Sequence, residues 1–239
     1  MLAVSGPLVT CGYFQKHLWV ILGLCSLATA ALLGEGLTTA GYLSAAAAAA
    51  AYVGSVVWLY DRRPTGRVLL VLVSATALLG AWSSTPATPS PWSADLWGRL
   101  AQAAVWLDPL AGGLVLGSTM AAMLLGHWYL NTPTMALAPL QRLVQWMGVS
   151  ILLRAISCLL GLLLFWHFSG TPSSTLLCFV ALRWLAGIFG AAVVVVMTWY
   201  TLKIPNTQSA TGILYVGVIV TFLGELTAQL LSQQSPVPL

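Results

Sequence analysis

The chain has 239 residues, of which 59% are hydrophobic and 6% are charged, with a formal net charge of +4. A soluble domain carries about 25% charged residues, so this composition excludes an ordinary soluble protein and predicts a chain solvated by lipid. The mean hydropathy of +0.91 agrees with that prediction. Nucleic-acid binding is not expected, because the sequence has no stripe of lysine and arginine with interleaved aromatic residues.

Seven segments are long and apolar enough to be membrane spans, since a helix needs about 20 apolar residues to cross the hydrocarbon core. They are His17–Gly34, Gly41–Tyr60, Arg67–Trp82, Pro109–Leu130, Leu143–Trp166, Leu176–Tyr200 and Thr211–Leu231. The stretches between them contain the Pro, Gly, Asn and Ser residues that end helices. The fold class expected is therefore all-α: a polytopic integral membrane bundle of about seven transmembrane helices, forming one domain over residues 1–239.

Two segments between the third and fourth spans differ from the rest. Ser83–Pro91 is rich in Ser, Thr and Pro and is expected to be an exposed loop. Trp92–Leu107 mixes apolar residues with Asp95 and Arg99, which is typical of a helix lying in the membrane interface. At the N-terminus, Ala28-Thr29-Ala30 resembles a signal-peptide cleavage site, but the first charge, Lys16, comes late for a signal sequence, so an uncleaved first helix is expected.

The basic residues predict how the chain is oriented. With a cytoplasmic N-terminus and an outside C-terminus, the inside segments hold six basic residues: Lys16, Arg62, Arg63, Arg67, Arg142 and Lys203. The outside segments hold only Arg99, with Glu35 and Asp95. This distribution obeys the positive-inside rule. The location expected is a cell membrane, with a bacterial inner membrane as the default, and the expected partners are the lipid bilayer and other membrane subunits.

Small residues recur at spacings that let helices approach closely. The second span contains seven consecutive alanines, Ala45–Ala51. Gly113 and Gly117 form a G-x-x-x-G pattern in the fourth span, and Ala186 and Gly190 repeat the small-residue spacing in the sixth. Such patterns favour tight packing between transmembrane helices.

Three ionisable residues lie inside apolar spans: Arg154 in the fifth, Arg183 in the sixth and Glu225 in the seventh. A charge near the bilayer centre costs at least about 2.5–3.5 kcal/mol, so such residues face the protein interior and mark functional pathways. At a rise of about 1.5 Å per residue, all three fall within one slab of the membrane. We therefore expect them to converge.

Uncharged polar residues share helix faces with these charges, because positions three and four apart lie on one side of a helix. Ser150 and Ser157 accompany Arg154, and Thr221 and Gln229 accompany Glu225. The sequence predicts that these eight residues line a ligand or proton pathway: Asp108, Ser150, Arg154, Ser157, Arg183, Thr221, Glu225 and Gln229.

Pairing within this set has two alternatives. Arg183 with Glu225 is the expected ion pair, with Arg154 satisfied by hydroxyls and carbonyls, which leaves one guanidinium in surplus. Asp108 precedes Pro109, a combination that favours a helix start with Asp108 as an N-cap at the outer rim. If the helix instead continues back through Trp106, Asp108 enters the slab and neutralises the cluster.

Two histidines, His17 and His127, fall near the cytoplasmic ends of the first and fourth spans, so they are candidate ligands for one haem iron. The four cysteines form no C-x-x-C pair, and no metal site is expected. The sequence also lacks a metal-binding H-E-x-x-H motif. No catalytic residues are assigned, and an enzyme is not favoured.

The function expected is transport or proton relay of a small polar or anionic species. One alternative is a redox membrane subunit binding haem or quinone. Another is a non-catalytic scaffold or assembly subunit, in which the buried charges form a structural ion pair that sets the helix register.

Overall fold

The structure is a computed structural model, and it describes most of the chain. The described residues are 8–34, 36, 38–85, 95–132, 135–169, 173–204, 206–233, 235 and 237–239. The expected loop at Ser83–Pro91 falls largely outside them, as does Glu35; of that loop, Ser83 and Ser84 end a helix.

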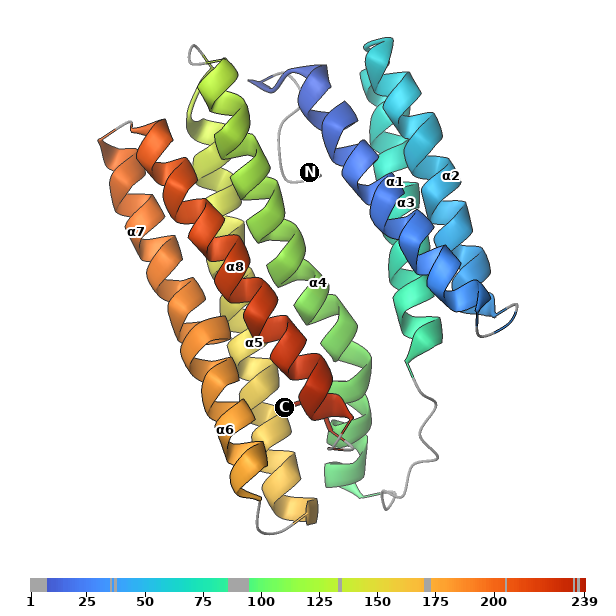
Figure 1. Ribbon diagram of the computed structural model, residues 1–239, viewed down its shortest axis with the longest axis vertical. Helices are drawn as coiled ribbons and strands as arrows, with labels where there is room; N and C mark the ends of the chain where they lie inside the picture. Colours follow the sequence, from blue (N-terminus) through green and yellow to red (C-terminus); the bar gives the residue numbers. More distant parts are fainter. Residues whose placement is uncertain are drawn as a thin grey trace. The chain divides into compact units, whose positions relative to one another are not determined.

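Every regular element in the described residues is a helix (Figure 1). They are α1 (Cys11–Leu33), α2 (Thr39–Leu59), α3 (Arg63–Ser84), α4 (Leu96–Asn131), α5 (Ala138–Ser169), α6 (Ser174–Leu182), the π-helix η2 (Arg183–Gly190), α7 (Ala191–Lys203) and α8 (Thr207–Ser232). Because α6, η2 and α7 are continuous, the chain has seven helices that are long and apolar enough to cross a membrane. The predicted fold class is confirmed.

Large apolar side chains on the outside of these helices agree with a lipid environment. Leu27, Ile219 and Phe189 are each about two-thirds exposed, at 69%, 66% and 65%. In water such a surface would drive association, whereas hydrocarbon solvates it. The outward faces are therefore built to contact lipid.

The helices form two compact units, residues 1–87 and 88–239. In the first unit α1 packs on α2, and α2 packs on α3. The second unit contains α4 to α8, including η2, and holds all the intramembrane charges of the predicted pathway. The single-domain organisation expected from the sequence stays a prediction.

The alanine-rich span is the centre of the first unit. Ala47 and Ala51 are fully buried, and the position of a β-carbon at Gly54 would lie 3.2 Å from Leu18 of α1. At the end of α2, Trp58 stacks on Phe14 with ring centroids 4.2 Å apart. Small residues therefore let α1 approach α2 closely, as expected.

In the second unit the tightest helix contact joins η2 to α8. A β-carbon at Gly187 would lie 2.6 Å from the Cα atom of Gly224, so only glycine fits on both sides. The predicted G-x-x-x-G pattern behaves differently, because a β-carbon at Gly113 or Gly117 would meet nothing within 4 Å. Close helix packing at that pattern stays a prediction.

The fourth span begins earlier than the sequence suggested. Asp95 caps α4 by accepting a hydrogen bond from the Gly98 amide at 3.0 Å, and the helix then runs through Pro109 to Asn131. Residues 96–107 are therefore the first turns of α4, and no separate helix precedes the span in the described residues. Proline is tolerated within a transmembrane helix because neighbouring groups satisfy the carbonyl that it leaves free.

The last residues of the chain fold back onto the second unit. Val237 and Leu239 are 1% and 2% exposed and join a core cluster with Leu164 and Phe165 of α5. Gly161 leaves room there for the backbone of Pro238. This segment covers the end of α5 that lies beyond Arg154.

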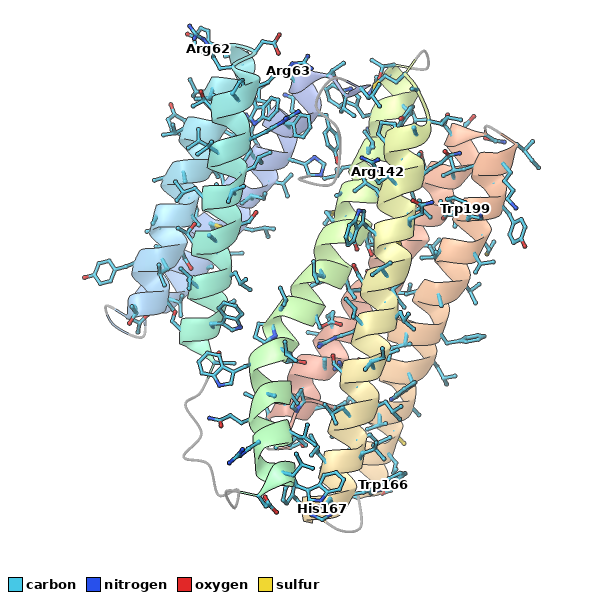
Figure 2. The ribbon with its side chains drawn as sticks, turned by 180° about the vertical axis from the view of Figure 1, so that it is seen from behind. Arg62, Arg63, Arg142, Trp166, His167 and Trp199 are labelled. Atoms are coloured by element: carbon cyan, nitrogen blue, oxygen red, sulfur yellow. The ribbon has the colours of Figure 1, made fainter. Side chains whose placement is uncertain are left out.

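Within the second unit, the two ends of the bundle carry different residues. Arg142 and Trp199 lie toward one end, and Trp166 and His167 lie at the other (Figure 2). This agrees with successive helices running in opposite directions. Which end faces the cytoplasm stays a prediction.

The contact between Gly187 and Gly224 generates a test of stability. Gly224→Ala should destabilise the protein by about 1–3 kcal/mol, because its methyl group would overpack against the η2 backbone. The matched control is Gly212→Ala on the same helix, where a β-carbon meets nothing within 4 Å. Unfolding midpoints in detergent measure both, and equal midpoints for the two variants would contradict the assignment.

Candidate functional site

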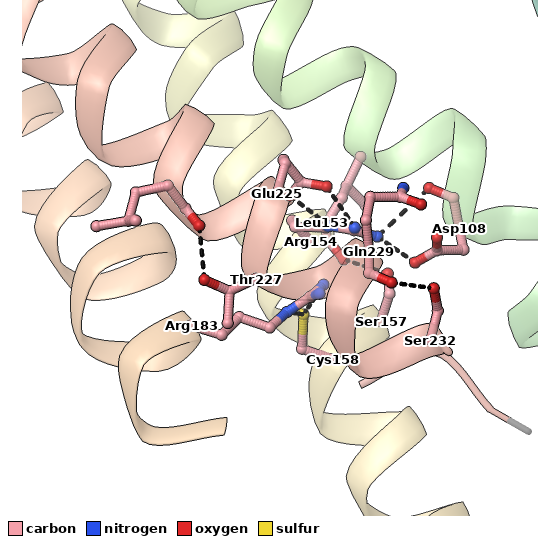
Figure 3. A network of polar contacts seen from close by, with 11 residues as sticks. Asp108, Leu153, Arg154, Ser157, Cys158, Arg183, Glu225, Thr227, Gln229 and Ser232 are labelled. Atoms are coloured by element: carbon pink, nitrogen blue, oxygen red, sulfur yellow. Dashed lines mark hydrogen bonds and ion pairs between the residues drawn. The ribbon is translucent and has the colours of Figure 1, made fainter. Parts of the chain in front are cut away.

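Arg154 lies at the centre of the charged site, near the middle of α5, and is only 3% exposed. Its Nε and Nη2 atoms donate to Oε1 and Oε2 of Glu225 at 2.8 and 2.5 Å. Its Nη1 atom donates to Oδ1 of Asp108 at 2.5 Å (Figure 3). One guanidinium therefore holds two carboxylates from two other helices.

Asp108 reaches Arg154 because α4 does not start at Pro109. The carboxylate is 21% exposed, and the backbone carbonyl of Asp108 also accepts from Arg154 Nη1 at 3.3 Å. The rim N-cap interpretation was wrong, since Asp95 is the cap of this helix. The alternative, in which the helix continues through Trp106 and Asp108 enters the cluster, is the arrangement found.

Glu225 comes from α8 and is 13% exposed. Its bidentate pair with Arg154 is the strongest geometry available to a carboxylate and a guanidinium. Gly112, one turn after Asp108 on α4, makes the space for it: a β-carbon there would lie 2.7 Å from Glu225 Oε2. Any larger residue at position 112 would collide with the ion pair.

Arg183 has a different partner from the one expected. It is 3% exposed, and its Nε and Nη2 atoms donate to the sulfur of Cys158 at 3.2 and 2.9 Å. Within the described part of the chain Arg183 forms no ion pair, and Glu225 binds Arg154. The expected pair of Arg183 with Glu225 was wrong, because Cys158, four residues after Arg154 on α5, occupies the Arg183 fork.

The charge count changes with the position of Asp108. Two guanidinium groups, Arg154 and Arg183, accompany two carboxylates, Asp108 and Glu225, so the formal charges balance. The prediction that one guanidinium is in surplus is therefore wrong. What remains unequal is the distribution, because both carboxylates contact the same arginine.

In the described part of the chain, no hydrogen bond joins the remaining polar residues of the predicted pathway to the charges. The hydroxyls of Ser150, Ser157 and Thr221 donate to carbonyls three or four residues earlier on their own helices. Gln229 is exposed on α8. Such back-bonding satisfies a hydroxyl in an apolar setting, and a pathway role for these four residues stays a prediction.

The two candidate haem ligands belong to different units. His17 is 6% exposed, and its Nδ1 atom donates to the Tyr13 carbonyl at 3.3 Å, while its Nε2 atom has no partner among the described residues. His127 is exposed and lies 3.3 Å from the Tyr215 hydroxyl. Joint ligation of one haem stays a prediction. Among the described residues, no three His, Cys, Asp or Glu side chains gather as metal ligands.

Sequence reasoning missed three features of the site. Gly112 lies four residues after Asp108, so helical spacing could have connected it to the charges. The helical spacing of the fifth span does place Cys158 on the face of Arg154, but the contact of its sulfur with Arg183 was missed. The π-helix that starts at Arg183 left no signal in the residue types. Comparisons with protein family models, curated proteins and solved structures found no match for the chain.

The shared arginine gives a test that separates charge pairing from packing. Arg154→Met should cost about 3–5 kcal/mol, because it leaves two buried carboxylates without a counter-charge. Adding Asp108→Asn and Glu225→Gln to Arg154→Met should recover most of that loss, since three coupled groups are not additive. Equilibrium unfolding in mixed micelles measures each variant. A triple variant less stable than Arg154→Met would contradict the charge assignment.

Proposed function

We propose that the protein moves protons, alone or coupled to a small polar or anionic species, through the cluster of Asp108, Arg154 and Glu225. The observation that supports this proposal is one guanidinium shared by two carboxylates from different helices within a membrane bundle. Ionisable groups inside membranes commonly form proton relays and substrate pathways.

The shared arginine gives the cluster two ways to hold its charge. When both carboxylates are ionised, Arg154 binds both and the group of three carries a net charge of −1. A proton on Glu225 or Asp108 neutralises that carboxylate and leaves Arg154 paired with the other one.

The depth of burial differs within the cluster. Asp108 and Glu225 are 21% and 13% exposed, whereas Arg154 is 3% exposed. The carboxylates that would gain and lose a proton are thus less deeply buried than the cation that holds them. A purely structural ion pair needs no such difference, although it would use the same contacts.

A role as a redox subunit or as a scaffold makes different demands on the same residues. A haem protein would show a Soret band in its absorbance spectrum and lose it on changing His17 or His127. A scaffold would tolerate neutral replacements of the charges that preserve folding. The proton proposal instead requires that such replacements stop transport in a protein that remains folded.

Proton flux into liposomes containing the purified protein tests the proposal directly. An internal pH-sensitive dye reports acidification when a potassium diffusion potential draws protons inward. Glu225→Gln keeps the shape of the side chain but removes the proton site, so it should reduce flux by about tenfold or more.

The matched control is Thr198→Val on α7, a buried hydroxyl outside the predicted pathway that donates to the Val194 carbonyl of its own helix. It should keep the flux of the unchanged protein. If Glu225→Gln, shown to be folded by its elution and unfolding midpoint, also keeps that flux, the proposed function is wrong.

A further inference from the structure

Within the described residues, Arg183 is a buried cation without a counter-charge. It is 3% exposed, and the hydrogen bonds described for its side chain are two to the Cys158 sulfur. A thiol is a weak, neutral acceptor, whereas a guanidinium carries five N–H donors. Burying a charge is costly unless it is paired and hydrogen-bonded. The three N–H groups that Cys158 does not accept are therefore suited to a further acceptor that carries negative charge.

The backbone around Arg183 is specialised independently of that contact. Arg183 is the first residue of η2, an eight-residue π-helix inside an otherwise α-helical span. Short π-helical segments within α-helices occur often at functional sites. The same segment meets α8 at Gly187 and Gly224, and Gly224 directly precedes Glu225. Arg183 thus lies on the segment whose Gly187 packs against the residue directly before Glu225.

The two arginines are neighbours through Cys158. Arg154 and Cys158 are four residues apart on α5, and such residues lie about 5–6 Å apart along one helix face. Cys158 in turn contacts Arg183 (Figure 3). The group of three around Arg154 carries −1, and Arg183 carries +1, so the four charges together are neutral when both carboxylates are ionised.

This neutrality links anion binding to protonation. An anion that binds Arg183 alone would bring the site to −1 in a low-dielectric region, where uncompensated charge is expensive. An anion that arrives with one proton, taken up by Asp108 or Glu225, leaves the site neutral. The proton neutralises one carboxylate, and the anion supplies the negative charge that is missing beside Arg183.

We propose that Arg183 binds a small monovalent anion and that each bound anion is accompanied by one proton on the Asp108, Arg154 and Glu225 cluster. This inference rests on the proposed function and names its substrate class. The anion is recognised by its single negative charge and its ability to accept hydrogen bonds from the N–H groups of Arg183 left free by Cys158. Halides and small oxyanions share that chemistry.

Anion-driven acidification of liposomes tests the inference. Liposomes containing the protein are prepared in gluconate and diluted into chloride or nitrate at equal pH, with an internal dye as readout and no imposed voltage. The unchanged protein should acidify the interior as chloride or nitrate enters with protons. The two arms distinguish a halide from an oxyanion as the better substrate, and sulfate outside should not drive acidification because it is divalent.

Arg183→Gln should lower anion-driven acidification by about tenfold or more, because it removes the buried cation. Arg142→Gln is the matched control, since Arg142 is an exposed arginine near the start of α5. Cys158→Ser keeps a neutral acceptor for the Arg183 fork and should keep anion-driven acidification; loss of that acidification would show that a thiolate is the counter-charge of Arg183 and would overturn the inference.

If Arg183→Gln does not fold, Arg183→Lys retains the charge without the planar fork and should raise the half-saturating chloride or nitrate concentration about tenfold. An Arg183→Lys variant with unchanged concentration dependence would overturn the anion site. The anion site would also be overturned if the unchanged protein carried protons under voltage but not with chloride or nitrate, and that result would leave the proposed proton function intact. The proton function is tested separately by the loss of voltage-driven proton flux in Glu225→Gln.

Discussion

The pairing of Arg154 with Asp108 and Glu225 is the constraint on which the second unit depends. It joins α4, α5 and α8 through one guanidinium that is almost completely buried. In an apolar region such a charge must be compensated nearby, so the three helices must keep the register that brings the carboxylates to it. Gly112 serves the same requirement, because its missing side chain is the space that the Glu225 carboxylate occupies.

The unequal sharing of charge connects this constraint with the proposed activity. Arg154 has two carboxylates, and Arg183 has a thiol. In a site where every cation had its own carboxylate, each charge would already be compensated, so neither proton exchange nor anion binding would be favoured. In the proposed mechanism, a proton neutralises part of the negative charge beside Arg154, and an anion supplies negative charge beside Arg183. The two events compensate each other electrically within neighbouring helix turns.

The position of Arg183 depends on backbone geometry more than on residue type. The π-helix η2 begins at this residue, and the contact between Gly187 and Gly224 brings η2 against α8. Both features place Arg183 on a segment that packs against the residue directly before Glu225. Cys158 then completes the arrangement from α5, because it accepts two of the Arg183 N–H groups.

The amino-acid sequence by itself determined the membrane class, the seven spans and the choice of Arg154, Arg183 and Glu225 as intramembrane charges, because hydropathy and span length act locally along the chain. Only the tertiary structure decided the partners. Asp108 followed by Pro109 is typical of a helix start, yet cross-helix pairing with Arg154 and the cap at Asp95 place Asp108 inside α4. Cys158 took the place assigned to Glu225 beside Arg183, since a side chain's partner depends on which faces of distant helices meet, and residue spacing within one helix carries no information about that.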